Sequence, residues 1–241
     1  DSTIRTFKAQ QVEYFRNEKE FYAKNNVKVY DEREELHGSC GQLNYYINNG
    51  YGYLMKNPIM ILATRDSLTL SAEKIEYFEN FKKVVANFNV KTELKDFYIT
   101  SDFLLYFSEQ GKAIYLGEPK FFSDFANADA KEFQIYFENE KIKNAHLEDS
   151  CRVDFRTEEQ IEKLNWVTSD FMDFIFEKGK ITIYEAEQNV NSFFKQEETE
   201  KKDFSVNNAT GEKLIVKIKD NEIESITMKH RVKGKYKFKK E

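Results

Sequence analysis

A pattern that recurs about every thirty residues constrains this 241-residue chain more than any other feature. Each unit opens with a small residue, continues through two spacers to an apolar residue, and closes after another spacer on aromatic or aliphatic residues. The intervals between units are 32, 31, 29, 29, 39 and 42 residues, so the fifth and sixth units contain insertions. A fixed period of this length is typical of proteins built from stacked structural repeats. The opening residues are Ala9, Gly41, Ala72, Ser101, Ala130, Ser169 and Gly211.

Each unit is expected to contain two long strands. The alternation of Phe133, Ile135 and Phe137 is the period-2 signature of a strand with one buried face. A strand of about 12 residues would span roughly 40 Å, so we expect it to bend at its small residue or proline and to serve two facing sheets. Pro58 and Pro119 fall at nearly the same phase of their units, which predicts a bulge, corner or edge there.

These features predict an all-β fold, an elongated antiparallel β-jellyroll or solenoid of about seven two-strand repeats. We expect one domain that covers residues 1–241. Two inserts interrupt it: residues 156–164 resemble a short helical turn, and residues 195–203 form a charged loop.

Composition and charge exclude several classes of protein. The net charge of −5 and the pI of about 5.5 offer nothing to attract phosphates, so no nucleic-acid partner is expected. The sequence contains no run of about 18 apolar residues, so no membrane-spanning helix is expected. An aromatic content of 15% argues against disorder, although 33% of the residues are charged. The chain begins at Asp1 without a signal peptide, which suggests processing or truncation.

Residues for chemistry are sparse. His37, His146 and His230 lie in different units, no metal-ligand spacing is present, and no phosphate loop or nucleophile motif occurs. The sequence therefore predicts no enzyme, no metal and no cofactor, although a carboxylate pair for glycoside cleavage stays open. Cys40 and Cys151 lie about three units apart, too far for a disulfide, so both are expected to be free thiols.

Large apolar side chains recur at similar phases of successive units. They either fill a core or line an apolar groove in which acyl chains would gain about 0.8 kcal/mol per buried CH₂. If they line a groove, a charge at Ile135 or Phe174 should weaken lipid binding more than folding. The candidates are Val12, Tyr14, Tyr45, Ile47, Ile75, Tyr77, Leu105, Phe107, Phe133, Ile135, Phe137, Phe174, Phe176 and Val216.

Residues 70–78 and 84–91 carry the small-x-x-apolar-x-aromatic motif followed by a V-x-V strand, and residues 27–29 and 151–153 fit its second half. In this the chain resembles, from about Thr6 to Phe238, the OstA-like (organic solvent tolerance protein A) repeats of periplasmic lipopolysaccharide-transport proteins. The resemblance implies a β-jellyroll whose V-shaped interior holds the acyl chains of a glycolipid. It also implies members that stack end to end through open edge strands, forming a bridge from an inner-membrane transporter to an outer-membrane translocon. It implies no catalytic residue.

We therefore predict a periplasmic bridge protein that carries lipopolysaccharide or a related glycolipid to the outer membrane by shielding its acyl chains. The expected partners are the glycolipid, other OstA-like proteins paired at edge strands, and further copies of this chain arranged head to tail. Whether it is a free bridge, a transporter-associated member or the N-terminal domain of the translocon stays open. The alternatives are a structural or adhesive β-solenoid with protein partners only, and a carbohydrate-binding solenoid.

Overall fold

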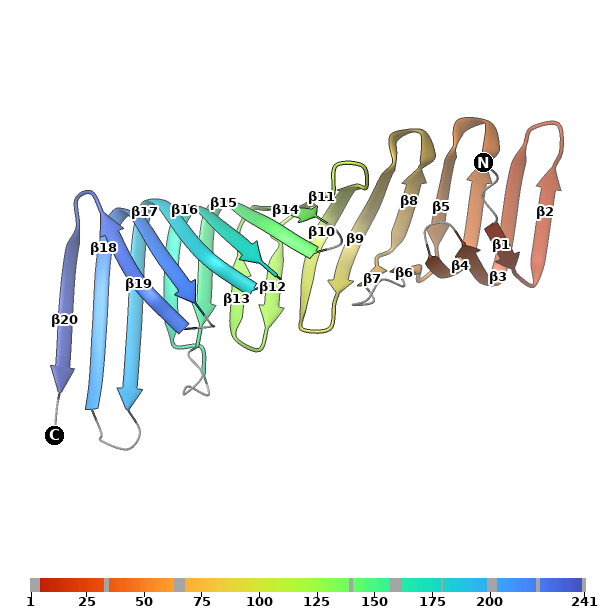
Figure 1. Ribbon diagram of the computed structural model, residues 1–241. Coiled ribbons are helices and arrows are strands. Elements are labelled where there is room, and N and C mark those ends of the chain that lie inside the picture. Colours follow the sequence, from red (N-terminus) through yellow and green to blue (C-terminus); the bar gives the residue numbers. More distant parts are fainter. Residues whose placement is uncertain are drawn as a thin grey trace. The chain divides into compact units, whose positions relative to one another are not determined.

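The structure is a computed structural model that describes residues 5–32, 35–62, 68–138, 141–156, 162–178, 180–198, 203–219 and 222–239. Within these ranges the regular structure is antiparallel strand, apart from two short 3₁₀ turns, η1 (Ile47–Asn49) and η2 (Glu79–Phe81) (Figure 1). The all-β prediction is therefore confirmed. Contacts divide the chain into two compact units, Asp1–Gly117 and Glu118–Glu241, each of which is described by itself. The single domain and the number of repeats stay predictions.

The described residues of unit 1 form eleven strands. They are β1 (Arg5–Lys8), β2 (Gln11–Phe15), β3 (Glu20–Asp31), β4 (Leu36–Tyr46), β5 (Tyr51–Met55), β6 (Ile59–Leu62), β7 (Leu68–Ser71), β8 (Lys74–Phe78), β9 (Lys83–Glu93), β10 (Phe97–Phe107) and β11 (Lys112–Leu116).

Each long strand of unit 1 contributes to two sheets, because its hydrogen-bond register breaks near its middle. The break in β3 lies between Lys24 and Val27, and the break in β10 lies between Ser101 and Phe103. On one side of the breaks, sheet 1 runs in the order β2, β3, β4, β5, β8, β9, β10, β11. On the other side, sheet 2 runs in the order β1, β3, β4, β6, β7, β9, β10. The break in β3 lies opposite Gly41 of β4, and the break in β10 follows Ser101, so the predicted bend at the small residue is confirmed for β4 and β10.

Unit 2 has the same plan. Its strands are β12 (Lys120–Ser123), β13 (Ala126–Asp129), β14 (Glu132–Glu138), β15 (Lys141–Phe155), β16 (Asn165–Glu177), β17 (Lys180–Glu198), β18 (Asp203–Lys219), β19 (Glu222–Lys229) and β20 (Lys233–Lys239). Sheet 3 consists of β14, β15, β16, β17, β18 and β19 in that order. Sheet 4 consists of β12, β13, β15, β16, β17, β18 and β20, so the four long strands again serve both sheets.

Pairs of residues with positive φ form the corners between the sheets. Asn tolerates this left-handed conformation better than most residues, and it occupies the second place in four of the pairs. The residue after the pair is buried at most corners, and both prolines occupy this place, which confirms that Pro58 and Pro119 mark corners. The pairs are 25 and 26, 56 and 57, 88 and 89, 117 and 118, 149 and 150, 188 and 189, and 230 and 231.

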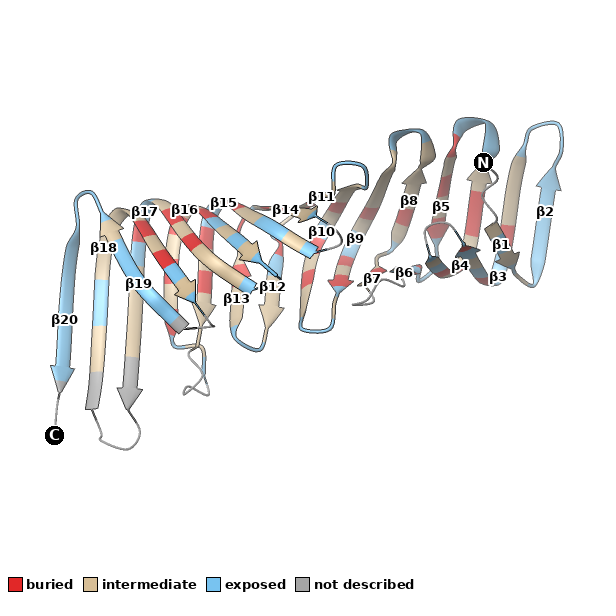
Figure 2. Ribbon diagram, viewed as in Figure 1, coloured by how far each residue is buried: buried red, intermediate tan, exposed pale blue. Residues whose placement is uncertain are grey.

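Buried residues form red bands along the strands of both units (Figure 2), and along most strands they alternate with more exposed residues, as expected for strands with one buried face. In sheet 1 a single cross-strand row provides the core, in which Ile75 and Ala23 are fully buried. Burial of such side chains contributes about 1.5–3 kcal/mol each relative to exposure. In order, this row is Ala23, Leu43, Leu54, Ile75, Ala86, Leu104 and Tyr115.

The two predicted inserts differ in how far the structure describes them. Most of residues 156–164 lie outside the described residues, so the helical turn stays a prediction. In the second insert, β17 continues to Glu198 and β18 begins at Asp203, so the predicted loop is shorter than residues 195–203. Strand pairing continues there because Glu198 lies opposite Asp203 in the ladder.

Candidate functional site

The buried faces of sheets 1 and 2 point toward each other. The ring of Phe7, from sheet 2, lies 4.7 Å from the ring of Phe21 in sheet 1. A methyl carbon of Leu54 in sheet 1 lies 3.5 Å from the place where Gly38 of sheet 2 would carry a Cβ atom. Unit 1 thus encloses an apolar interior between two sheets that are joined at the corners.

Farther from the corners, the same inward face carries large side chains that are only half-buried. We call them the rim of unit 1. They form the cross-strand row next to the core row, near the ends of the hairpins. Most of them are aromatic residues or leucines. The rim of unit 1 comprises Phe21, Tyr45, Tyr77, Val84 and Tyr106 of sheet 1 with Leu36, Leu62, Leu68 and Phe97 of sheet 2.

A polar cluster interrupts the rim beside the edge strand β1. The Arg5 guanidinium donates to Asp31 at 2.7 Å, to the Tyr45 hydroxyl at 3.0 Å and to Glu79. Although burial opposes its charge, these partners raise the pKa of Arg5. Burial also raises the pKa of Tyr45 to about 12, and the Tyr45 hydroxyl donates to Glu79 at 2.6 Å. The cluster therefore ties sheet 2 to sheet 1 at the rim.

Unit 2 repeats the arrangement with a more apolar rim. Its core row in sheet 3 includes Phe133 and Met172, both almost fully buried. Ile135, Tyr184 and Val216 form a second buried row. Beyond a bulge in each hairpin comes a third row of half-buried side chains, which we call the rim of unit 2. It comprises Phe137, Ile142, Phe176, Ile181 and Ile218, and it ends on Ile223 of β19, which is exposed.

Eleven of the fourteen candidates from the sequence lie on the inward faces. Tyr45, Tyr77, Phe137 and Phe176 belong to the rims. Tyr14 lies opposite Phe21 and extends the rim row of unit 1. The others fill or extend the rows behind the rims: Val12, Ile75, Phe133, Ile135, Phe174 and Val216.

Three candidates do not lie where the repeat phase placed them. Leu105 and Phe107 point to the opposite face of sheet 1, because Leu104 and Tyr106 take the inward positions of β10. Ile47 lies in the turn η1 and is 44% exposed. The lipid-binding role of the inward residues stays a prediction.

The inward rows end on exposed apolar side chains at the edge strands. Val12 of β2 continues the core row of sheet 1, yet it is 50% exposed because, among the described strands, β2 pairs with β3 on one side only. In unit 2, Ile226 of β19 and Tyr236 and Phe238 of β20 are exposed in the same way. Each edge therefore offers both unpaired backbone groups and apolar side chains.

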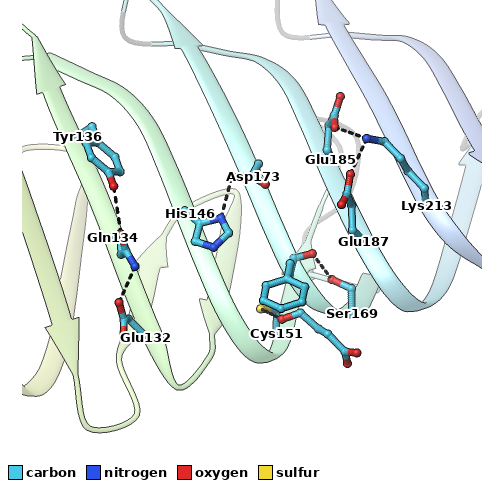
Figure 3. A network of polar contacts seen from close by, with 12 residues as sticks. Glu132, Gln134, Tyr136, His146, Cys151, Ser169, Asp173, Glu185, Glu187 and Lys213 are labelled. Carbon is cyan, nitrogen blue, oxygen red and sulfur yellow. Dashed lines mark hydrogen bonds and ion pairs between the residues drawn. The ribbon is translucent and has the colours of Figure 1, made fainter.

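The outward face of sheet 3 carries paired polar side chains (Figure 3). His146 contacts Asp173 at 2.8 Å, and Lys213 lies between Glu185 at 2.7 Å and Glu187 at 2.5 Å. Because each charge is paired with a neighbour on the sheet, this arrangement is typical of a solvated ladder. Among the described residues, no group of three His, Cys, Asp or Glu side chains could hold a metal ion.

Both cysteines are free and buried, as predicted. Cys151 follows the corner formed by residues 149 and 150, where its thiol contacts the Asp170 carbonyl. Burial raises the pKa of Cys40 to about 11 and, together with nearby aspartates, that of Cys151 to about 12. Both thiols are therefore in the un-ionised form at neutral pH.

The structure is therefore that of an all-β protein of antiparallel strands whose inward faces are apolar. No helix in the described part of the chain is long and apolar enough to cross a membrane. No protein-family model matches the chain, and no curated protein matches it. Among solved structures, one similar chain is LptH from Pseudomonas aeruginosa, described as the LptA-homologous periplasmic component of the lipopolysaccharide transport device. That similarity has a TM-score of 0.40 and 12% identity, and it covers 44% of this chain and 76% of the other.

Proposed function

We propose that this protein binds the acyl chains of a glycolipid, of the lipopolysaccharide class, along the rims of its two units. One observation carries the proposal: the rim residues are large and apolar and face inward, yet they remain half-exposed, whereas the row behind them is buried. A packed core alone would leave no reason to place Phe137 and Phe176 at an accessible inward position. Each CH₂ group that an acyl chain buries there contributes about 0.8 kcal/mol.

The structure changes the choice of variants. Ile135 is only 5% exposed and Phe174 stacks on Tyr184 at 4.8 Å, so a charge at either position will impair folding as well as binding. Phe176 is the better test, because it lies on the rim. Ile175 is its matched control, since it precedes Phe176 on β16, points to the opposite face and is 39% exposed.

The test is binding of lipid A to the purified, delipidated protein, with thermal unfolding measured in parallel. Phe176→Glu should weaken lipid A binding by about tenfold or more, whereas Ile175→Glu should leave it unchanged. Equal binding by both variants, with similar melting temperatures, would contradict the proposal. Failure of the unsubstituted protein to bind lipid A, and to contain lipid when isolated, would favour the structural solenoid.

The proposed partners follow from the edges. A strand from another OstA-like protein, or from a second copy of this chain, would pair with β19 or β20 and cover Ile226, Tyr236 and Phe238. Ile226→Glu should then reduce the self-association measured by analytical ultracentrifugation. Thr227→Glu, on the opposite face of β19, should not. If self-association is absent or unchanged in Ile226→Glu, the head-to-tail arrangement is wrong.

The repeat motif of periplasmic transport proteins supports a periplasmic location and a bridging role toward the outer membrane. The proposal contains no chemical step, metal or cofactor, because shielding of acyl chains is a passive binding function.

A further inference from the structure

An aromatic ladder crosses the outward face of sheet 1, opposite the core row. Its rings form one series of neighbours over β2, β3, β4, β5 and β8, with successive centroids 5.0 to 6.4 Å apart. Tyr46 and Tyr51 are nearly parallel and lie directly opposite each other in the register. The aromatic ladder comprises Phe15, Tyr22, Tyr46, Tyr51, Tyr53 and Phe78.

The fold itself does not require such a ladder. The outward face of sheet 3, built on the same plan in unit 2, has no such series: one of its two corresponding rows is polar (Figure 3), and the other contains Tyr136, Ile175 and Ile183. The polar row contains, across four strands, Gln134, His146, Asp173 and Glu185. Aromatic cross-strand pairs stabilise a sheet by about 0.2–1 kcal/mol each, but polar pairs meet the same structural need in unit 2.

Hydrogen-bonding groups are interleaved with the rings and held in fixed positions. Glu76 accepts bonds from the Tyr51 hydroxyl at 2.5 Å, from Lys74 at 2.8 Å and from Asn87 at 2.8 Å. Although burial opposes its charge, these donors lower the pKa of Glu76 and keep it ionised. Tyr22 donates to Glu20 in the same manner. The ladder thus presents ring surfaces and oriented polar groups side by side.

The charges of the ladder balance one another. Lys74 pairs with Glu76 and also lies 4.9 Å from the centroid of Tyr53. Lys83 lies over Phe78, with 4.5 Å between its Nζ and the ring centroid. Over β2 to β9 this face carries three carboxylates and three lysines, so it has no net charge with which to attract a polyanion. The six residues are Glu13, Glu20 and Glu76 with Lys24, Lys74 and Lys83.

We infer that the aromatic ladder binds a neutral, extended oligosaccharide chain. Pyranose rings present apolar C–H faces that pack on aromatic rings, and their hydroxyls need closely spaced donors and acceptors. Because the ladder runs across five adjacent strands, over about 20 Å, it suits a chain laid across the strands rather than a single sugar in a pocket. This site lies on the opposite face from the rims and does not depend on the proposed lipid function.

The experiment is calorimetric titration of the full chain with three hexasaccharides: cellohexaose, which is neutral and extended, maltohexaose, which is neutral and curved, and a hexamer of galacturonic acid, which is anionic. We expect cellohexaose to bind and the other two to bind at least about tenfold more weakly. No binding of cellohexaose, or preference for the anionic hexamer, would overturn the inference.

Variants place the binding on the ladder. Tyr46→Ala and Tyr51→Ala should each weaken cellohexaose binding by about tenfold, whereas Tyr51→Phe, which keeps the ring, should weaken it less. Tyr136→Ala, on the outward face of sheet 3, is the control and should bind normally. Thermal unfolding is measured for each variant. If folded ladder variants bind cellohexaose normally, the ladder is not the binding site. If they instead lose self-association and keep sugar binding, the ladder is a protein interface, and the inference is likewise contradicted.

Discussion

Arg5 and Glu79 lie on different sheets of unit 1, yet Nη2 of Arg5 is 3.3 Å from Oε1 of Glu79. Arg5 belongs to β1 at the edge of sheet 2, and Glu79 begins the turn η2 at the end of sheet 1. Tyr45 bonds to both. Because a hydrogen-bonded ion pair has a preferred geometry, it gives the two sheets a directional connection next to the proposed binding surface.

The first prediction concerns the pH dependence of this connection. Bonds from Tyr45 and Arg5 lower the pKa of Glu79 below its ordinary value of 4.5. A carboxylate with a lowered folded-state pKa stabilises the fold fully at neutral pH, and this stabilisation is lost as the pH falls below about 4.5. Glu79→Gln should therefore reduce stability at pH 7 and show a shallower loss in acid. Denaturant unfolding from pH 7 to pH 3 measures it.

Glu109→Gln is the control for Glu79, because Glu109 is exposed in the turn between β10 and β11. Its unfolding profile should follow that of the unsubstituted protein. If Glu79→Gln also follows it at every pH, the cluster of Arg5, Tyr45 and Glu79 contributes nothing to stability.

The second prediction tests the core row. Ile75 is fully buried between Leu54 and Ala86, so Ile75→Ala leaves a cavity and should cost about 2–5 kcal/mol of unfolding free energy. Phe81, which is 73% exposed in η2, provides the comparison, and Phe81→Ala should change stability by less than about 0.5 kcal/mol. Denaturant titrations of both variants measure these changes in unfolding free energy. Similar losses would mean that the inward row is not the core.

The sequence predicted the bends well, because a bend leaves a strong local signal. Proline cannot donate to a ladder, and Pro58 and Pro119 both follow a corner. The small residues opposite the corners are equally informative. A Cβ at Gly41 would lie 2.6 Å from the Cβ of Lys56, so only glycine fits there without a shift of the strand.

The faces of the strands were harder to predict, because some segments are apolar on both faces. Residues 103–107 contain no polar residue, so the alternation that separates inward from outward positions is absent. Leu105 was assigned inward where the structure places Leu104. The inward face of β10 is set by strand pairing, because Leu104 lies opposite Ala86 of the core row.

The rims were only partly found from sequence. The repeat motif predicts Tyr45, Tyr77, Phe137 and Phe176, but it does not include the leucines of sheet 2, because it covers the first strand of each unit. A period-2 reading of residues 36–40 and 68–71, starting from the corner, would have found Leu36 and Leu68. Whether these side chains pack together or accept a ligand depends on the spacing of the sheets, which no residue pattern encodes.

The third prediction concerns the close approach at the corners. Gly41→Ala places its Cβ against Lys56, so the strand must shift, at a cost of about 1–3 kcal/mol. Gly234 is the matched control, since a Cβ there would lie at an ordinary 3.7 Å from Ala209. Gly41→Ala should lower the melting temperature clearly more than Gly234→Ala. If the two substitutions have the same effect, the corner at residues 56 and 57 tolerates a side chain opposite it.

The fourth prediction concerns the thiols. Burial raises the pKa of Cys40 to about 11 and that of Cys151 to about 12, and the thiolate is the form that reacts with disulfide reagents. At pH 8 the folded protein should therefore react with Ellman's reagent far more slowly than free cysteine, and two thiols per chain should appear promptly in denaturant. Raising the pH to 9 should speed the reaction of the folded protein only in proportion to the small thiolate fraction.

Single variants separate the two positions. Cys40→Ala and Cys151→Ala leave one thiol each, and we expect Cys151 to be the slower of the two because its pKa is higher and nearby aspartates repel the thiolate. Rapid labelling of either thiol in the folded state would show that the interior opens near that corner on the timescale of the reaction. Fewer than two thiols in denaturant, restored by a reductant, would instead reveal a disulfide and contradict the separate placement of the two cysteines.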